Sequence, residues 1–432
     1  MITMDMIREV RKRVGLAMLT ILLAVLPVYA DVTPDQLKFT ETEGGYAVSK
    51  AEGATLSGAL VVPETFNGLP VVLIADRAFN GCKGLTAVTL PSGVRKIGTA
   101  AFTGCDSLAK VTLPEGLKYI NTMAFSGVEC LKSIDIPASV TFIDFGAFTY
   151  CYNLESINVA EGNASYRSVG GIVYDRSMQT LYRCPGKYSG KVAVPEGVKT
   201  IAGGAFVGCA HVTAISVPAS VEKIGGMAFF DCHNLKRIDV APENAVYRSV
   251  RGVLYDHDMK TALRCPGGYR GKVVIPASVT SVGRALSACH RLTAIHTAEG
   301  NATYRSVDGV LYDKDMQTLL FCPGGRRGTV VVPEGVTTIA DGGFFDCFHL
   351  KRIDLPSTLE NLGYRVFWHC KALESITCRA TTPSQTKRDT FETLYEEDAH
   401  YQSLPLYVPA ASLDAYRRDE AWGRFRNILP LE

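Results

Sequence analysis

Residues 85–107 read "LTAVTLPSGVRKIGTAAFTGCDS", residues 108–130 read "LAKVTLPEGLKYINTMAFSGVEC", and residues 131–153 read "LKSIDIPASVTFIDFGAFTYCYN". All three segments are 23 residues long, and a proline occupies the same position in each of them. A repeat of about 20 to 29 residues with leucine-type spacing is typical of a solenoid, in which each repeat forms one coil. The chain of 432 residues is therefore predicted to be a solenoid, although its length alone would suggest two or three domains.

Each coil has two kinds of apolar pattern. In residues 85–107 the apolar positions first alternate and then recur every three or four residues. Alternation indicates a β-strand, and the wider spacing indicates a short helical or 3-10 turn. Pro91 ends the strand, where its missing N–H interrupts no ladder bond. We therefore expect an α/β solenoid built from coils of about 23 residues.

A second, longer motif occurs three times, as "NASYRSVGGIVYDRSMQTLYRCPGK" from Asn163, "NAVYRSVRGVLYDHDMKTALRCPGG" from Asn244 and "NATYRSVDGVLYDKDMQTLLFCPGG" from Asn301. Pro137 and Pro195 are 58 residues apart, which equals one coil of 23 residues and an insert of 35. Segments such as "GVLYD" and "QTLLFC" flank an Asp-rich turn, a pattern typical of a β-hairpin. The sequence therefore predicts three β-hairpin modules that replace the helical part of a coil. A motif present three times is not expected to be a unique catalytic centre.

Two of the modules carry a pair of carboxylates, Asp256 with Asp258 and Asp313 with Asp315. Two oxygen ligands at this spacing suit calcium, but the first module has Asp-Arg-Ser there and no further acidic ligand is near. Asp side chains also accept bonds from backbone N–H groups in turns. We favour the structural turn and expect no metal site.

Asn163 and Asn301 lie in Asn-x-Ser and Asn-x-Thr sequences that permit glycosylation. The equivalent Asn244 is followed by Ala-Val, so the loop uses asparagine without a sequon. Both interpretations, glycan acceptor and structural asparagine, stay open at this point.

Thirteen cysteines raise the question of disulfide bonds. Eight of them occupy one coil position, three residues after the phenylalanine or its substitute, and Val128 fills that position in another coil. A position that accepts valine needs a small apolar group, so buried free thiols are favoured over a disulfide framework. Three of these cysteines have a histidine neighbour, at His233, His290 and His369. Adjacent residues point to different sides of a coil, so we interpret these as surface histidines and expect neither zinc nor a thiol nucleophile.

The chain contains none of the sequence motifs of serine hydrolases, zinc proteases, nucleotide-binding loops or dinucleotide-binding folds. We therefore expect no catalytic residue, no cofactor and no enzymatic activity.

The amino-terminal segment has the pattern of a secretory signal peptide, with Arg8, Arg11, Lys12 and Arg13 before the apolar run "LAMLTILLAVLPVYA". Cleavage is expected after Ala30, and the run is too short to span a bilayer comfortably. Removal of residues 1–30 takes away four basic and two acidic residues and leaves no net charge, which does not favour nucleic acid as a partner. No second long apolar segment follows. We expect a secreted or cell-surface protein that has no transmembrane helix.

The ends of the chain are predicted to cap the solenoid, because a bare terminal coil would expose its core. Residues 31–68 should hold an N-terminal cap hairpin, "LKFTETEGGYAVSKA", and the first strands. Residues 69–379 should form the solenoid. Residues 380–432 should form a C-terminal loop, over residues 380–404, and then a capping strand and amphipathic helix in "LYVPAASLDAYRRDEAWGRF".

The coil pattern L-x-x-I-x-I-P-x-x-V-x-x-I-x-x-x-A-F-x-x-C resembles the BspA-like leucine-rich repeat surface proteins of the Treponema and Bacteroides type. The resemblance extends from about Leu69 to Cys378, and the "VDGVLYDKD" hairpin with its "CPGG" tail is similar to inserts of that family. It implies a right-handed leucine-rich-repeat superhelix in a secreted or surface protein that binds other proteins, including host-matrix components, or promotes adhesion. The chain departs from ordinary leucine-rich repeats in having Gly93, Gly116 or Ser139 where an asparagine is usual.

Outward-pointing residues of the strands are the first candidates for binding, because alternation places them between two inward positions. Such a row lines the concave face of a solenoid, an extended surface that suits another macromolecule. The candidates are Asp135, Asn158, Asp239, His296 and Asp354, in a row that also contains Thr89, Thr112, Ser216 and Thr377. Polar residues at outward positions are also what any solvated strand face would carry.

The three modules supply the second candidates, Arg167, Arg248 and Arg305, each preceded by a tyrosine. Tyrosine and arginine dominate interface hot spots, but tyrosine could equally pack the hairpin onto the coil while arginine covers it. We expect an extracellular protein as the ligand. The alternatives are a glycan-binding module, for which the strand row lacks aromatic platforms, and, least favoured, a secreted hydrolase.

Overall fold

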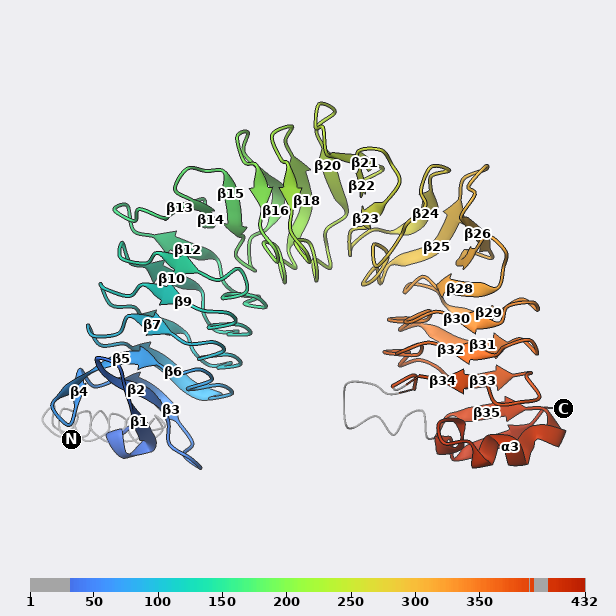
Figure 1. The fold of residues 1–432 in the computed structure, drawn as a ribbon, viewed down its shortest axis with the longest axis horizontal. Helices are drawn as coiled ribbons and strands as arrows, with labels where there is room; N and C mark the ends of the chain where they lie inside the picture. Colours follow the sequence, from blue (N-terminus) through green and yellow to red (C-terminus); the bar gives the residue numbers. More distant parts are fainter. Residues whose placement is uncertain (1–31, 388, 392–402, 432) are drawn as a thin grey trace, which may run out of the picture.

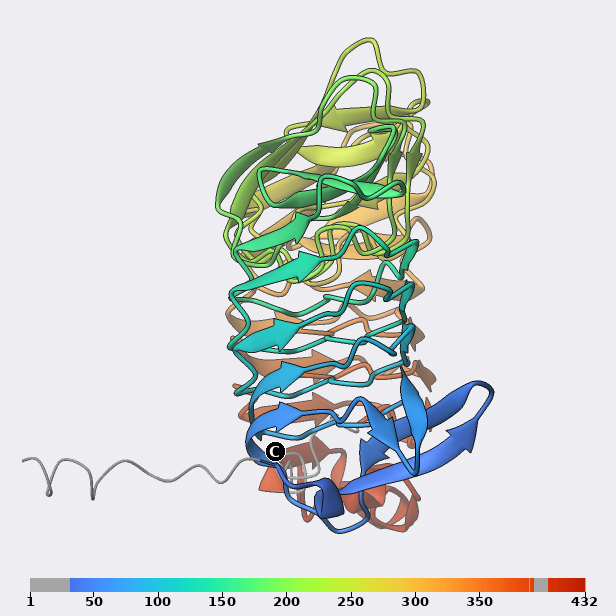
Figure 2. The ribbon, with the colours of Figure 1, turned by 90° about the vertical axis from the view of Figure 1, so that its left-hand side faces the viewer.

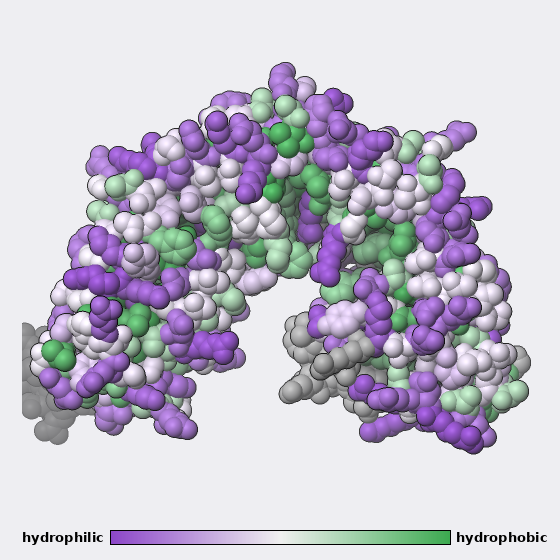
Figure 3. All heavy atoms as spheres, viewed as in Figure 1, coloured by the Kyte–Doolittle hydropathy of each residue, from purple (hydrophilic) through white to green (hydrophobic). Residues whose placement is uncertain are grey.

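The structure is a computed structural model that describes residues 32–387, 389–391 and 403–431. The predicted signal peptide lies outside the described residues. The chain forms an arch of stacked coils, and the first and last coils lie at its two separate ends (Figure 1). In the side view the coils of the near arm lie one above another, and the blue N-terminal hairpin projects from the base of the stack (Figure 2). Hydrophilic residues cover most of the face seen in Figure 3, with hydrophobic residues scattered along both arms and at the crown.

Each regular coil contributes two strands, and these form two rows along the arch that we call the long-strand lane and the short-strand lane. The long-strand lane contains β3 (Ser57–Val61), β6 (Gly84–Thr89), β8 (Lys110–Thr112), β10 (Ser133–Ile136), β12 (Ser156–Val159), β16 (Gly190–Ala193), β18 (Val212–Val217), β20 (Arg237–Val240), β24 (Gly271–Ile275), β25 (Leu292–Thr297), β29 (Gly328–Val331), β31 (Leu350–Leu355) and β33 (Ser375–Cys378). The short-strand lane contains β2 (Gly45–Lys50), β5 (Leu69–Ile74), β7 (Lys96–Ile97), β9 (Tyr119–Ile120), β11 (Phe142–Ile143), β15 (Thr180–Arg183), β17 (Thr200–Ile201), β19 (Lys223–Ile224), β23 (Ala262–Arg264), β28 (Thr318–Phe321), β30 (Thr338–Ile339), β32 (Asn361–Leu362) and β34 (Gln385–Thr386).

The 23-residue period sets the register of both lanes. In the long-strand lane Ile134 pairs with Ile157, and in the short-strand lane Ile97 pairs with Ile120, in parallel orientation. Because equivalent residues lie side by side, the inward isoleucines and leucines of successive coils build a continuous apolar core.

The "A-F-x-x-C" segment is not helical, so the expectation of an α/β solenoid is wrong and the fold is a β-solenoid. Ala100 and Gly104 have positive φ angles of 54° and 67°, which no right-handed helix contains. The N–H groups of residues 100, 102 and 104 donate to carbonyl oxygens of the next coil, at 2.9, 2.8 and 3.0 Å. These bonds between coils replace the bonds that a helix would make within itself. Within the described residues the complete helices are η1 (Pro34–Gln36), η2 (Ala410–Ser412), α3 (Leu413–Arg418) and η3 (Trp422–Arg424).

The phenylalanine of this segment forms stacks inside the core. Phe102 and Phe125 lie with ring centroids 5.3 Å apart and planes 4° from parallel, and Phe79 and Phe148 extend the stack on either side. Each such aromatic contact contributes about 0.5 to 1.5 kcal/mol beyond the area that it buries.

The cysteines of the coil are free thiols that point into the core. Cys105 Sγ donates to the carbonyl of Phe79 in the preceding coil at 3.1 Å, and Cys151 Sγ donates to Phe125 at 3.0 Å. Burial raises the pKa of Cys105 to about 12 and that of Cys151 to about 11. All cysteines lie within the described residues and all are free, as the buried-thiol interpretation predicted; Cys130 alone is exposed.

The three modules each add two strands before a strand of the short-strand lane. The added strands are β13 (Tyr166–Val169) and β14 (Ile172–Asp175), β21 (Tyr247–Val250) and β22 (Val253–Asp256), and β26 (Tyr304–Val307) and β27 (Val310–Asp313). In the last module β27 pairs antiparallel with both β26 and β28, so the first strand was missed by the sequence pattern. In its turn Asp313 Oδ1 accepts the N–H groups of Gln317 and Thr318, at 2.8 and 3.0 Å, in the manner of a structural turn.

A buried asparagine joins each module to the coil before it. Asn163 Nδ2 donates to the carbonyls of Pro137 and Val140, both at 2.9 Å, and its Oδ1 accepts the N–H groups of residues 165 and 166. Asn301 and Asn244 repeat this arrangement. A glycan on Nδ2 of Asn163 or Asn301 would replace one of the two donated hydrogens and would need space beside a side chain that is buried. The structure therefore favours the structural asparagine over the glycan acceptor.

The two ends close the stack. At the amino end β1 (Leu37–Thr42) pairs antiparallel with β2, and β4 (Thr65–Phe66) pairs with β5. At the other end β35 (Pro405–Val408) and β36 (Asn427–Pro430) extend the long-strand lane, and α3 and the buried Trp422 cover it. Residues 380–387 and 389–391 of the predicted loop complete a further coil, because β34 pairs with β32 and Phe391 stacks on Phe367 at 5.5 Å. Residues 388 and 392–402 of that loop lie outside the described residues. Among the helices of the described chain, none has the length and apolar character needed to cross a membrane.

Candidate functional site

The predicted outward residues of the long-strand lane lie in register, but they do not form one uninterrupted row. Asp135 pairs with Asn158 across β10 and β12, and Asn158 Nδ2 donates to Asp135 Oδ1 at 2.9 Å. Asp239, His296 and Asp354 lie in three other sheets, since the modules separate the lane into blocks. The structure therefore brings together only Asp135 and Asn158 of the five candidates.

Two of the remaining candidates already have cationic neighbours. Arg237 Nε lies 2.9 Å from Asp239 Oδ2, and Arg379 contacts Asp354 Oδ2 at 3.7 Å. Exposed ion pairs of this kind contribute about 0 to 1 kcal/mol. Both carboxylates therefore remain available to an incoming partner at little cost.

Sequence reasoning missed outward valines in the same lane. Val274 pairs with His296 and Val331 with Asp354, and both valines are exposed. They stand in the runs "KVVIP" and "TVVVP", where three apolar residues in succession hide the alternation. The 23-residue register with the neighbouring coil could have identified them.

The candidate arginines of the modules are exposed and lie far apart in the topology. Arg167, Arg248 and Arg305 lie on β13, β21 and β26, which belong to three different sheets. The tyrosine before each arginine packs against the coil before it, and its hydroxyl accepts a backbone N–H there. The tyrosines are therefore structural, as the packing alternative proposed, and no two of the three arginines share a sheet. Arg248 Nη2 lies 3.3 Å from Nε2 of His257.

An exposed group of aromatic side chains lies on the short-strand lane and was not predicted. Tyr119 and Phe142 are neighbours across β9 and β11, with ring centroids 6.5 Å apart. The name aromatic patch is used here for these two side chains and for the exposed Phe145 and Met123 of the same two coils, with exposed fractions of 47%, 44%, 44% and 40% for Tyr119, Phe142, Phe145 and Met123. The ring of Phe145 lies 5.1 Å from that of Tyr182 on β15. The pattern that could have revealed it is the two-residue strand, "KI", "YI" and "FI" in successive coils, whose first residue faces outward.

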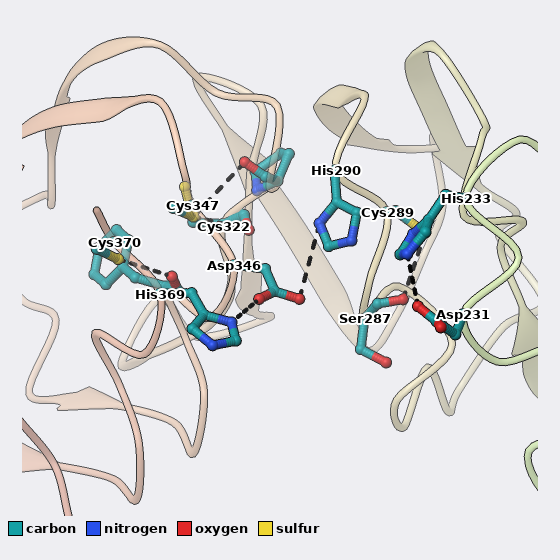
Figure 4. Close-up of polar contacts among 12 residues, drawn as sticks. Asp231, His233, Ser287, Cys289, His290, Cys322, Asp346, Cys347, His369 and Cys370 are labelled. Carbon is teal, nitrogen blue, oxygen red and sulfur yellow. Dashed lines mark hydrogen bonds and ion pairs between the residues drawn. The ribbon is translucent and has the colours of Figure 1, made fainter. Parts of the chain in front are cut away.

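The histidines beside the coil cysteines converge, contrary to our expectation of separate surface residues (Figure 4). The rings of His233 and His290 lie 5.4 Å apart, although a whole module separates them in the sequence. The close approach is possible because the glycines of the "CPGG" segment between them have no side chains, so the neighbouring backbones can pack closely. A Cβ on Gly267 would lie 2.9 Å from the carbonyl oxygen of Cys232 and 3.3 Å from that of Ala288.

Two carboxylates hold these imidazole rings. His233 Nε2 lies 2.6 Å from Asp231 Oδ1, and the hydrogen bond raises the pKa of His233. His369 Nδ1 lies 2.7 Å from Asp346 Oδ1, and His290 Nδ1 lies 3.9 Å from Asp346 Oδ2. Burial lowers the pKa of His290.

The thiols next to these histidines do not join the cluster. Cys232 Sγ donates to the carbonyl of Phe206 at 3.0 Å, and Cys289 Sγ donates to that of Cys265 at 3.3 Å. Over residues 32–387, 389–391 and 403–431, no group of three or more His, Cys, Asp or Glu side chains has a geometry that could hold a metal ion. The cluster therefore supplies charge and hydrogen bonds and does not form a Cys–His nucleophile.

A family model of repeat proteins matches more than half of the chain. The profile described as "BspA type Leucine rich repeat region" matches the chain in six copies, over residues 70–169, 182–249 and 326–396. These residues make up more than half of the chain. No curated protein matches it.

Solved structures of bacterial repeat proteins are similar over most of their length. A leucine rich cell surface protein from Faecalibacterium prausnitzii is 19% identical, with 85% of this chain and 97% of that chain covered and a TM-score of 0.36. A leucine-rich repeat protein from Eubacterium ventriosum is 21% identical, with 85% and 95% covered and a TM-score of 0.39. The pneumococcal vaccine antigen PcpA is 17% identical, with 94% and 100% covered and a TM-score of 0.37.

Proposed function

Because the chain belongs to the BspA-type leucine-rich repeat family, we propose that it is a secreted or cell-surface protein that binds another protein outside the cell. The predicted signal peptide over residues 1–30 supports this location. Host-matrix proteins and cell-surface proteins are the class of partner to test first, with adhesion as the biological role.

The aromatic patch is the observation that carries the proposal. Large apolar side chains that stay together on the surface mark interaction sites in soluble proteins. Tyrosine and phenylalanine supply large contact areas and are enriched in the buried centres of protein interfaces. Tyr119, Phe142 and Phe145 therefore have the character of anchors for a protein partner.

The coil architecture holds these side chains in place before binding. Tyr119 lies on β9, which pairs with β7 on one side and β11 on the other, and Phe142 lies on β11, which pairs with β9. A surface that is already ordered loses little conformational entropy on association. The patch can therefore bind a partner without a folding step.

The polar candidates remain proposed binding residues at separate places on the arch, and the same assay tests them separately. They comprise the lane residues Asp135, Asn158, Asp239, His296 and Asp354 and the module residues Arg167, Arg248 and Arg305. The weak ion pairs of Asp239 and Asp354 are compatible with exchange for a partner's cation.

The experiment measures binding of residues 31–432 to immobilised extracellular-matrix proteins, cell-surface proteins and neutral glycans. A variant with Tyr119→Ser, Phe142→Ser and Phe145→Ser removes the anchors. The matched control, Val61→Ser, Leu69→Ser and Val331→Ser, removes three apolar side chains that are at least as exposed, at 67%, 51% and 62%. We expect the wild-type protein to show saturable binding to one of the proteins. The affinity should fall about tenfold or more in the first variant, since each of the three side chains contributes more than about 1 kcal/mol. The control variant should keep the wild-type affinity.

Three outcomes would contradict the role of the patch. In the first outcome, both serine variants keep binding, and a variant with Asp135→Ala, Asp239→Ala and Asp354→Ala loses it. This result would place the site on the long-strand lane. Binding to neutral glycans alone would replace the protein ligand by a glycan. Absence of saturable binding to every member of the panel would refute protein binding by this surface.

A further inference from the structure

A cavity of about 430 Å³ lies at the amino ends of β24, β25 and β29, beside the histidine cluster. Its lining consists of three arginines, two histidines, two glycines and one threonine, namely Arg270, Arg291, Arg327, His290, His349, Gly271, Gly325 and Thr293. No carboxylate lines it. The cavity is therefore strongly cationic, although the chain beyond the predicted signal peptide has no net charge.

The basic side chains come from successive coils and form a row. Gly271 lies beside Leu292 in the sheet, so Arg270 and Arg291, which immediately precede them, are neighbours. Gly328 lies beside Leu350 in the same way, and this brings Arg327 next to His349. The N–H of Gly325 donates to the carbonyl of Leu292 at 2.9 Å and joins the two pairs. Paired strands are about 5 Å apart, so within each pair the two basic side chains start about 5 Å from one another.

The row is specific to this part of the arch. The first module has Ser189 where the second and third have Arg270 and Arg327. The coil residue equivalent to Arg291 is Ser107 in one coil and Asn153 in another. The repeat therefore does not require a basic residue at either position, and the arginines are not explained by the stacking of coils.

The arginines are not neutralised by the protein. Arg270, Arg291 and Arg327 form no ion pair with any carboxylate in the part of the chain that the structure describes, and Arg291 bonds to the neutral Oδ1 of Asn234 at 3.2 Å. The two carboxylates of the neighbouring cluster are occupied by other groups. Asp231 accepts bonds from His233 and from the hydroxyl of Tyr152, at 2.6 and 2.8 Å, and Asp346 contacts two imidazoles.

Adjacent cations without counter-charges repel one another, and an anion that lies between them removes this repulsion. Guanidinium groups bind sulfate and phosphate oxygens through paired, parallel N–H donors, which favours oxyanions over other anions. A row that crosses several coils matches a chain of such groups better than one isolated ion. We propose that this cavity binds a linear polymer that carries sulfate or phosphate groups, with its oxyanions placed along Arg270, Arg291, Arg327 and His349.

This inference does not depend on the proposed protein partner, because the cavity and the aromatic patch lie on different coils. The probes are heparin, which carries sulfate, inorganic polyphosphate, which carries phosphate, and uncharged dextran. Binding to residues 31–432 is measured at an ionic strength of about 0.15 M, where the screening length is about 8 Å. The test variant carries Arg270→Gln, Arg291→Gln and Arg327→Gln.

The matched control carries Arg77→Gln, Arg176→Gln and Arg418→Gln, so it loses the same charge from exposed positions outside the cavity and outside the proposed protein-binding residues. We expect wild-type protein to bind heparin or polyphosphate and not dextran. The test variant should bind about tenfold or more weakly, while the control stays within about twofold. The slope of log affinity against log salt should become shallower by about 2 in the test variant, since about 0.7 counterions are released per neutralised charge on a single-stranded polyanion.

Binding of heparin alone would assign a sulfated ligand, and binding of polyphosphate alone would assign a phosphorylated one. Equal losses of affinity in the two variants would show that the polyanion responds only to the overall charge of the protein, which would overturn the proposal. Binding to dextran, or no binding to either polyanion, would also overturn it. The variant Tyr119→Ser, Phe142→Ser and Phe145→Ser should keep its polyanion binding, so failure of this inference and failure of the proposed protein binding are distinguishable.

Discussion

The hydroxyl of Tyr166 accepts the backbone N–H of Ile143 at 3.0 Å, at the point where the first module interrupts the short-strand lane. The same bond joins Tyr247 to the N–H of Ile224 at 2.9 Å, and Tyr304 to that of Val282 at 3.2 Å. Each module takes the place of the next regular short strand, so β11, β19 and the segment at Val282 have no strand partner on that side. In each case the tyrosine hydroxyl accepts the backbone N–H that would otherwise lack a partner. The tyrosine of the repeated "YRSV" sequence therefore caps the edge of a sheet.

Replacement of this hydroxyl should destabilise the protein. Tyr166→Phe leaves the N–H of Ile143 without its partner, and a buried unsatisfied donor costs about 1 to 3 kcal/mol. The measurement is the free energy of unfolding in guanidinium chloride. Tyr119→Phe is the control, because the Tyr119 side chain is exposed and surface substitutions change stability by about 0.5 kcal/mol or less. Equal stability of the two variants would contradict the capping role.

Asn163 should be essential for attachment of the first module. Asn163→Asp replaces a donor to two carbonyl groups by a carboxylate oxygen, which leaves both acceptors unpaired and adds repulsion. We expect a loss of about 3 kcal/mol or more in the free energy of unfolding. The exposed Asn80 supplies a matched control, and Asn80→Asp should leave stability unchanged within about 0.5 kcal/mol. A small effect of Asn163→Asp would show that the buried bonds do not hold the module.

Cys130 should be the cysteine that reacts in the folded protein. It is exposed, whereas the others are buried and those at 105 and 151 have pKa values raised by burial to about 12 and 11. The buried thiols should resist iodoacetamide at about pH 8 because the reagent cannot reach them, and at Cys105 and Cys151 also because little of the reactive thiolate forms. Mass spectrometry should find one modified residue in native protein, none in Cys130→Ser, and thirteen modified cysteines after denaturation. Native labelling of a coil cysteine at a comparable rate would refute this protection.

His233 and His290 should titrate on opposite sides of the usual histidine pKa. The hydrogen bond to Asp231 raises the pKa of His233, while burial lowers that of His290. Two-dimensional NMR of the imidazole rings should therefore show His233 losing its proton at higher pH than His290. The reverse order would contradict the assigned hydrogen bond.

The same shifts predict the pH dependence of stability. The contribution of His233 is fully present below the unfolded pKa of about 6.5 and is lost as the pH rises through its raised folded value. The free energy lost in His233→Gln should therefore be larger at about pH 5.5 than at about pH 8.5. His290→Gln should show the opposite trend, because a buried neutral imidazole loses its contribution as the pH falls through its lowered folded pKa. If the stability loss changed with pH in the same direction in both variants, His233 and His290 would not have pKa values shifted in opposite directions.

The candidate binding residues show which features of a site a sequence pattern can predict and which it cannot. The 23-residue period correctly places Asp135 beside Asn158, because parallel pairing of equal coils keeps equal positions together. The pattern could not reveal that the modules divide the lane, since strand pairing across an insert depends on how that insert folds. The aromatic patch was missed for a different reason: the short strand has only two residues, too few for an alternation to be recognised.

The sequence by itself determined the period of the coil, the inward positions of the core, the three modules and the free thiols, because each of these depends on local alternation or on exact repetition. It did not determine the conformation of the "A-F-x-x-C" segment, where spacing of three and four suggested a helix. That segment is held by hydrogen bonds between coils, which exist only once the neighbours are stacked. The approach of His233 to His290, and the placement of Arg270, Arg291 and Arg327 around one cavity, were likewise decided by tertiary structure. Glycines without side chains let segments from separate repeats pack closely together there.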